Sequence, residues 1–185
     1  MQSRWFAAVF VLVVSASEPA FACRAYSPIV LDDIRYADVV LVGRISGYQI
    51  VRDEAFRQRM LSNPNLAPDL RRIYEGRHSL LSDYARFEIQ VDEVLVGSAP
   101  RRLSVTWDNS TFGEPEQMAP GPFLIALRQS SSILPPLRGP SATVLPNAEP
   151  NLYTVLQAPC SRPFLFESTS NEASIVRRIV KAQRP

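Results

Sequence analysis

The stretch ADVVLVGRISGYQIV, residues 37–51, decides the fold, because it is long, rich in β-branched residues and contains two glycines, Gly43 and Gly47. Valine and isoleucine favour strands, since their branched side chains fit a pleated surface. Glycine inside a strand marks a bulge or a tight bend. The pattern therefore predicts one long strand that bends at its glycines, as the strands of a small barrel do.

Four further segments have the composition or the alternation of strands. In residues 84–96 (YARFEIQVDEVLV), apolar residues alternate with charged or amide residues, which is typical of a strand with one buried face. Residues 102–107 repeat this alternation, residues 123–127 form a short apolar run, and residues 151–157 supply a fifth strand. We expect a mainly β fold, in which five antiparallel strands form a Greek-key barrel of the OB type, with a β-sandwich as the alternative.

Three segments depart from the β pattern. Residues 52–82 mix charged and apolar residues and hold two prolines, which predicts two short helices inserted between the first two strands. In residues 169–183, Thr169 and Glu172 have the spacing of a capping box, and the apolar residues that follow fall on one face, which predicts a C-terminal helix. Residues 134–150 contain five prolines, which forbid regular strand pairing and predict a surface loop.

The start of the chain predicts export. Arg4 precedes an apolar run over residues 5–14, and residues 20–22 read Ala-Phe-Ala, which is the pattern of a signal-peptide cleavage site. We expect residues 1–22 to be a signal peptide and residues 23–185 to form a single domain that is secreted or periplasmic. No later apolar stretch approaches the roughly 20 residues that a membrane-spanning helix needs.

The chain has two cysteines, Cys23 and Cys160. In an oxidising compartment the simplest outcome is one disulfide between them, which ties the mature N-terminus to the body of the domain. The alternative is a structural lipoprotein of the cell envelope, in which Cys23 carries a lipid directly after the cleavage site.

Composition and motifs point away from catalysis and from nucleic-acid binding. The formal net charge is only +2 and is spread without blocks, so no nucleic acid is expected as a partner. The single histidine, His78, lies in the helical insertion, and no nucleophile motif or His/Cys metal site accompanies it. Asp108, Glu114 and Glu116 flank one loop, but their spacing matches no calcium loop. We therefore expect a monomer without catalytic residues, metal or cofactor; an enzyme that uses these acids is the remaining hypothesis.

The order of several short segments resembles a known family. The segments are ADVVLVGRI, ARFEIQVDEVLVGSAP, PGPFLIALR and APCSRP, at residues 37–45, 85–100, 120–128 and 158–163, preceded by Cys23. Together they resemble the tissue inhibitor of metalloproteinases (TIMP) family, especially its bacterial netrin-like relatives. The resemblance implies an OB-type barrel with helices packed on it.

The resemblance also implies a mode of binding. In the animal inhibitors the mature N-terminal cysteine, held by a disulfide, lays its free amine and its carbonyl on the catalytic zinc of a protease. Cys23 occupies the matching position, so the implied function is a protein-binding domain, in its sharper form a metalloprotease inhibitor that contacts a zinc metalloprotease through Cys23, Arg24 and Ala25. The animal C-x-C start is reduced to one cysteine here, and Arg24 replaces a small residue. A purely structural role for Cys23, as a tether, stays open beside zinc chelation.

Overall fold

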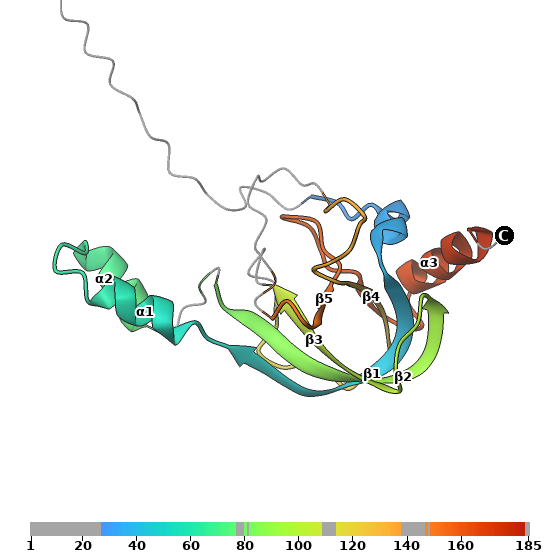
Figure 1. The fold of residues 1–185 in the computed structure, drawn as a ribbon, viewed down its shortest axis with the longest axis horizontal. Helices are drawn as coiled ribbons and strands as arrows, with labels where there is room; N and C mark the ends of the chain where they lie inside the picture. Colours follow the sequence, from blue (N-terminus) through green and yellow to red (C-terminus); the bar gives the residue numbers. More distant parts are fainter. Residues whose placement is uncertain are drawn as a thin grey trace, which may run out of the picture.

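The structure is a computed structural model that describes residues 27–76, 80, 82–108, 114–137, 147 and 149–183. Strands β1 and β2 are long and curved, and they form the floor of the molecule in the view of Figure 1. The elements within the described residues are, in chain order, η1 (Leu31–Tyr36), β1 (Val39–Val51), α1 (Glu54–Leu61), α2 (Pro68–Glu75), β2 (Tyr84–Val96), β3 (Arg102–Asp108), β4 (Phe123–Arg128), β5 (Tyr153–Val155), β6 (Leu165–Glu167) and α3 (Asn171–Ala182).

Five strands close a barrel in the order β1-β2-β3-β5-β4, because β4 pairs back onto β1. The expected five-stranded OB-type barrel is therefore confirmed, and the sandwich alternative is wrong. The expectation that all five strands are antiparallel is also wrong, since β3 and β5 run parallel. The chain crosses the barrel to form β4 before it returns as β5, and such a crossover permits a parallel pair. Strand β6, which the sequence did not predict, adds to β4 outside the closed ring.

Strand β1 is bent at both glycines, as its sequence predicts. The register against β2 shifts between Val42 and Gly43 and again between Ser46 and Gln49. Gly47 has a φ of 61°, which few other residues adopt, and a Cβ at Gly43 would lie 2.6 Å from the carbonyl oxygen of Gln90. Glycine thus permits the kink at one position and the close approach of β2 at the other.

The core has two parts, which lie inside and outside the barrel wall. Val39 and Leu41 of β1 point into the barrel, whereas Val40 and Val42 belong to an outer cluster with residues of α3. The residues of β4 are likewise divided between the cluster inside the barrel and the outer cluster. The apolar runs of β1 and β4 are continuous because both faces are buried, while β2 alternates because its outer face meets water.

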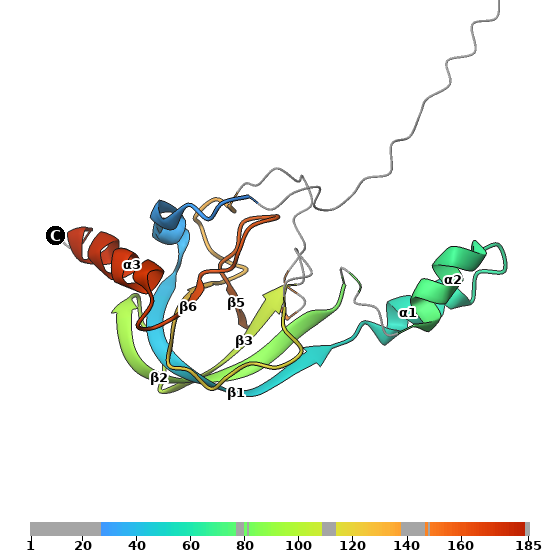
Figure 2. The ribbon, with the colours of Figure 1, turned by 180° about the vertical axis from the view of Figure 1, so that it is seen from behind.

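The helices form two separate features. Helices α1 and α2 pack on each other and extend away from the barrel as an arm, so the two expected helices are present in the insertion (Figure 1). Helix α3 lies beside η1 and β6 (Figure 2). Its N-cap is Ser170, whose Oγ accepts from the amide of Ala173 at 3.1 Å, so the prediction of Thr169 as the cap is wrong. None of the described helices is long and apolar enough to cross a membrane.

The proline-rich segment is partly buried. Leu137 packs in the outer cluster with Ile34 and Leu156. Residues 138–146 and 148 of this predicted surface loop lie outside the described residues. Pro135 and Pro136 are exposed, as a surface loop predicts, whereas Leu137 directly after them is buried.

Candidate functional site

The predicted contact residues at the mature N-terminus, Cys23, Arg24 and Ala25, lie outside the described residues, as does His78. The description of the chain begins at Ser27, two residues after Ala25. The structure therefore shows where the predicted site attaches to the barrel. We call this attachment the N-terminal anchor and define it by Ser27, Trp107, Gln157, Cys160 and Ser161.

Ser27 is fixed by backbone pairing. Its amide donates to the carbonyl oxygen of Cys160 at 2.7 Å, and it forms an isolated parallel bridge with Ser161. Cys160 is buried and has a φ of 60°, an uncommon conformation outside glycine. This turn of the backbone presents the carbonyl that holds Ser27.

The core of the barrel supports this turn. The indole Nε1 of Trp107 on β3 donates to Gln157 Oε1 at 2.8 Å, and Gln157 Nε2 donates to the carbonyl oxygen of Ser161 at 2.7 Å. Trp107 is part of the inner core cluster. The Gln157 side chain therefore connects the barrel interior to the residue that Ser27 pairs with, and it gives the anchor a defined position.

The anchor is compatible with the predicted disulfide. A chain spans at most about 3.5 Å per residue, so Cys23, four residues before Ser27, reaches about 14 Å from it at most. Because Ser27 is hydrogen-bonded to Cys160 itself, the pairing is within reach. The described part of the chain contains no free thiol. The Cys23–Cys160 bond itself stays a prediction, because Cys23 lies outside the described residues.

Of the three acids that flank the loop after β3, Asp108 and Glu114 have different surroundings, and Glu116 is exposed. Burial raises the pKa of Asp108 to about 6, and a hydrogen bond from Thr154 offsets part of that increase. Glu114 lies near Tyr48, whose hydroxyl donates to Pro115 at 2.7 Å; burial, and then the charge of Glu114, raise the pKa of Tyr48. Among the described residues no group of three potential ligands comes together. Asp108 and Glu114 are thus engaged with separate strands, β5 and β1.

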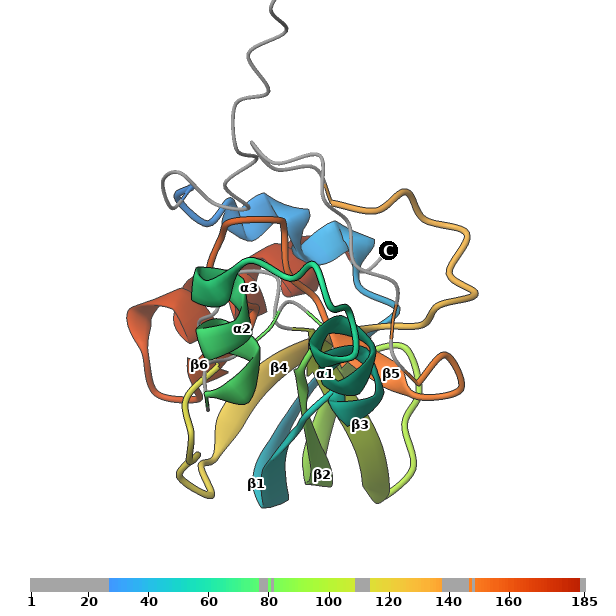
Figure 3. The same cartoon turned by 90° about the vertical axis from the view of Figure 1, so that its left-hand side faces the viewer.

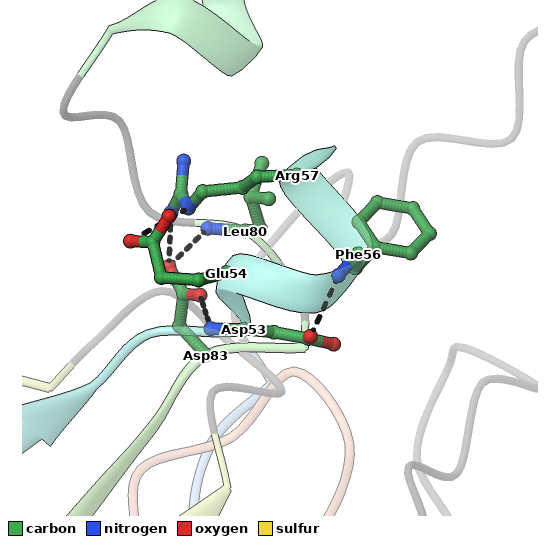
Figure 4. A network of polar contacts seen from close by, with 6 residues as sticks. All are labelled: Asp53, Glu54, Phe56, Arg57, Leu80 and Asp83. Carbon is green, nitrogen blue, oxygen red and sulfur yellow. Dashed lines mark hydrogen bonds and ion pairs between the residues drawn. The ribbon is translucent and has the colours of Figure 1, made fainter. Parts of the chain in front are cut away.

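The base of the helical arm holds a buried polar network that sequence reasoning missed (Figure 4). Asp83, just before β2, accepts from Arg57 Nη2 at 2.7 Å and from the amides of Asp53 and Leu80 at 2.9 Å each. Asp53 in turn caps α1 by accepting from the amide of Phe56. The two ends of the insertion are therefore tied together where they leave the barrel.

A second set of missed contacts ties the described end of the proline-rich segment to β2 and β3. The hydroxyl of Tyr84 donates to Glu149 Oε1 at 3.0 Å, and burial followed by this bond raises the pKa of Tyr84. The Oδ1 of Asn147 lies 3.1 Å from Thr106 Oγ1 and accepts from the amide of Glu149. An Asn-Ala-Glu sequence between two prolines carries no local signal for such contacts.

Known proteins give no further information about this site. No protein-family model, curated protein or solved structure that was compared matches the chain. The function is therefore argued from the residues and their geometry.

Proposed function

We propose that this chain is an exported, non-enzymatic protein-binding domain that uses the residues directly after its predicted cleavage site as part of its binding surface. The observation that carries the proposal is the pairing of Ser27 with Cys160 and Ser161. A newly exposed N-terminus is ordinarily free to move, whereas here it is attached to a barrel only a few residues from its end.

The anchor lowers the cost of binding. Ordering a flexible segment opposes association, and a segment that is held before the partner arrives avoids part of that cost. The Trp107–Gln157–Ser161 chain of hydrogen bonds holds the anchor from inside the barrel. A disulfide from Cys160 to Cys23 extends the same restraint to the first residue of the mature chain.

In its sharper form the proposal is inhibition of a zinc metalloprotease, and the resemblance to the TIMP family supports it. The free amine and the carbonyl of Cys23 would both donate lone pairs to the protease zinc and displace its water. Arg24 would then enter the neighbouring substrate pocket, and its guanidinium favours a pocket lined by carboxylates. The partner is accordingly a protease that accepts basic side chains.

The first experiment is N-terminal sequencing and intact mass of the natively exported protein, with and without reductant. A chain that begins at an unmodified Cys23 and gains two hydrogens on reduction supports the anchored terminus. A diacylglyceryl group on Cys23 supports the envelope lipoprotein instead and overturns chelation.

The second experiment measures inhibition of purified zinc metalloproteases by the mature chain. The matched control carries one extra alanine before Cys23, which removes the amine from its position and changes nothing in the barrel. We expect inhibition by the mature chain and about 100-fold weaker inhibition, or ~2.7 kcal/mol, by the extended chain. Two results show that the inhibitor form of the proposal is wrong. One is equal inhibition by the mature and the extended chain, and the other is no inhibition by a mature chain whose Cys23 has an unmodified α-amine.

A further inference from the structure

Strand β5 closes the barrel through a short parallel pairing with β3, which we call the seam. The pairing joins Val105 to Tyr153 and Thr106 to Thr154, and Figure 3 shows β5 beside β3. On its other side β5 is equally short in its pairing with β4. So short a ladder supplies few backbone hydrogen bonds, so side-chain contacts matter to how firmly β5 is held on β3.

The outward-facing side chains of β3 at the seam are covered by the chain that leads into β5. Trp107 points into the barrel, so its neighbours Thr106 and Asp108 face outward. Thr106 is nevertheless completely buried. Its hydroxyl lies 3.1 Å from Asn147 Oδ1 and 3.4 Å from the carbonyl oxygen of Tyr153. The chain on either side of Glu149 therefore lies against the outer face of β3.

We call Asn147 and residues 149–155 the cover, and the cover is also held to β2. Glu149 Oε1 accepts from the hydroxyl of Tyr84 at 3.0 Å and lies 3.4 Å from Nε of Arg86. Tyr84 and Arg86 are on the same outer face as Thr106, because they alternate with residues of the inner cluster. The cover thus contacts both β2 and β3 on the outside of the barrel wall.

Asp108 and Thr154 form a polar contact across the seam. The carboxyl of Asp108 is hydrogen-bonded to the Thr154 side chain, and Thr154 Oγ1 also lies 3.3 Å from the carbonyl oxygen of Thr106, to which it donates. A threonine hydroxyl has one proton, so it donates to one of these acceptors at a time. A protonated Asp108 can donate to Thr154 Oγ1 and leave the Thr154 proton for Thr106. An ionised Asp108 only accepts, and it draws the Thr154 proton away from Thr106.

The charged groups nearest to Asp108 are engaged with other partners. Tyr84 lies opposite Asp108 in the ladder and is bonded to Glu149, whose charge is paired with Arg86. Arg128 of β4, on the far side of β5, donates to carbonyl oxygens of the loop that follows it. Burial is the larger influence on the carboxyl, and it raises the pKa of Asp108 from 3.8 to about 6.

We propose that Asp108 makes the seam a pH-sensitive latch, in which the protonated carboxyl keeps the cover closed on β3 and its ionisation loosens the cover. The inference goes beyond the proposed function, because the latch needs no partner. The closed state holds the proton more tightly than a state in which Asp108 meets water, so deprotonation favours opening. Between pH 4 and 7 the opening equilibrium should rise by up to about 100-fold, which is the ratio that pKa values of 3.8 and about 6 allow.

Hydrogen exchange of the mature wild-type chain, followed by NMR from pH 4 to 8, measures the opening. Each rate is compared with the intrinsic rate at the same pH, and the ratio is the protection of that amide. We expect protection at residues 153–155 to fall by up to about 100-fold, with the midpoint at which the carboxyl carbon signal of Asp108 titrates. The amide of Ala126, which donates to Phe164 at 2.9 Å, reports unfolding of the whole barrel. Dilute urea should speed exchange at Ala126 and barely change it at residues 153–155, because a local opening exposes little surface.

Two substitutions separate the latch from a general effect of charge. Asp108→Asn does not ionise, and its amide can still donate to Thr154, so residues 153–155 should stay protected across the pH range. Glu149→Gln removes the other acid at the cover and should keep the wild-type pH dependence, with lower protection throughout.

Three results overturn the inference. The first is equal protection and an equal response to urea at residues 153–155 and at Ala126, which means that the barrel opens only as a whole. The second is a loss of protection that does not follow the titration of Asp108. The third is a loss in Asp108→Asn as large as that in the wild type. The first two need no variant, so they decide the matter even where a substitution impairs folding.

Discussion

Arg57 Nη2 donates to Asp83 Oδ2 at 2.7 Å across the base of the helical arm, and the two side chains are only 4% and 2% exposed. A buried ion pair gains little over a well-packed apolar pair, because both charges lose their water. Removing one partner is strongly destabilising, because the other charge is then left buried without it. The pair is therefore better understood as a device that fixes where the arm leaves the barrel.

We predict that Asp83→Ala lowers the free energy of unfolding by about 3–5 kcal/mol. The substitution leaves Arg57 with only the more distant carboxylate of Glu54, 3.9 Å from its Nε, and removes the acceptor for the amides of Asp53 and Leu80. Urea denaturation followed by circular dichroism measures the change. The control is Asp69→Ala, which breaks the exposed ion pair of Asp69 with Arg72 and costs about 0.5 kcal/mol or less. A cost for Asp83→Ala as small as that of the control contradicts the prediction.

A second prediction concerns pH. Burial raises the pKa of Asp108 from 3.8 to about 6, so between these values the folded chain binds a proton that the unfolded chain has lost. The free energy of unfolding then falls as pH rises from about 4 to about 6, by about 3 kcal/mol in total, and this contribution is constant above that range.

Asp108→Asn removes this dependence, because the amide does not ionise and can still accept from Thr154. Urea denaturation at a series of pH values from 4 to 8 should show the advantage of the variant over wild type growing between about pH 4 and 6. Glu88→Gln, at an exposed position on β2, should keep the wild-type profile. Parallel curves for Asp108→Asn and wild type across this range count against a buried, ionising Asp108.

The parts of the fold that follow from local patterns could be predicted from the sequence. The glycine-bent β1, the alternating β2, the two helices of the arm and the C-terminal helix each have a signal within a dozen residues or so. The parallel pairing of β3 with β5 has none, because it depends on where the chain returns after β4. Strand β6 is only three residues long, too short to show a period.

Helix α3 shows the limit of such patterns at single-residue resolution. Both Thr169 and Ser170 are good N-cap residues, and the capping-box spacing favoured Thr169. The structure selects Ser170, whose Oγ accepts from Ala173. We predict that Ser170→Ala costs about 1 kcal/mol of unfolding free energy, whereas Thr169→Ala is nearly neutral. Equal losses for both variants in thermal or urea unfolding show that the cap is shared or wrongly placed.

The two glycines of β1 make a matched pair for substitution by alanine. A Cβ at Gly43 meets Gln90 O and Ile89 Cγ2 at 2.6 Å, and neither the backbone of β2 nor a core side chain can move away without cost. At Gly47 the space is open and only the positive φ opposes a side chain. We predict that Gly47→Ala costs about 1 kcal/mol. Gly43→Ala should cost about 3 kcal/mol or prevent folding, which urea denaturation and soluble yield would reveal. If Gly47→Ala costs more than Gly43→Ala, β2 does not approach β1 so closely at Gly43.

The candidate site could not be predicted as a site from the sequence, because its contacts join distant residues. Trp107 and Gln157 are 50 residues apart, and Ser27 pairs with Cys160 and Ser161 near the other end of the chain. Tryptophan, glutamine and serine occur in many structural roles, so none of them signals a contact by itself. The sequence could name Cys23 and Cys160 only because two cysteines in a chain that is predicted to be exported have few alternatives.

The N-terminal anchor leads to a final prediction about local stability. Trp107→Phe keeps most of the ring in the core but removes the donor to Gln157 Oε1, so the Gln157 side chain no longer connects Ser161 to the barrel. We expect the free energy of unfolding to fall by about 1–2 kcal/mol. Hydrogen exchange at the Ser27 amide should become about 10-fold faster than this loss of global stability alone would make it. Tyr84→Phe is the control, since it also removes one side-chain donor, to Glu149, at a place outside the anchor. Exchange at Ser27 that responds equally to both substitutions means that Trp107 does not support the anchor. Faster exchange at Ser27 in Trp107→Phe alone shows that the barrel core supports the N-terminal anchor.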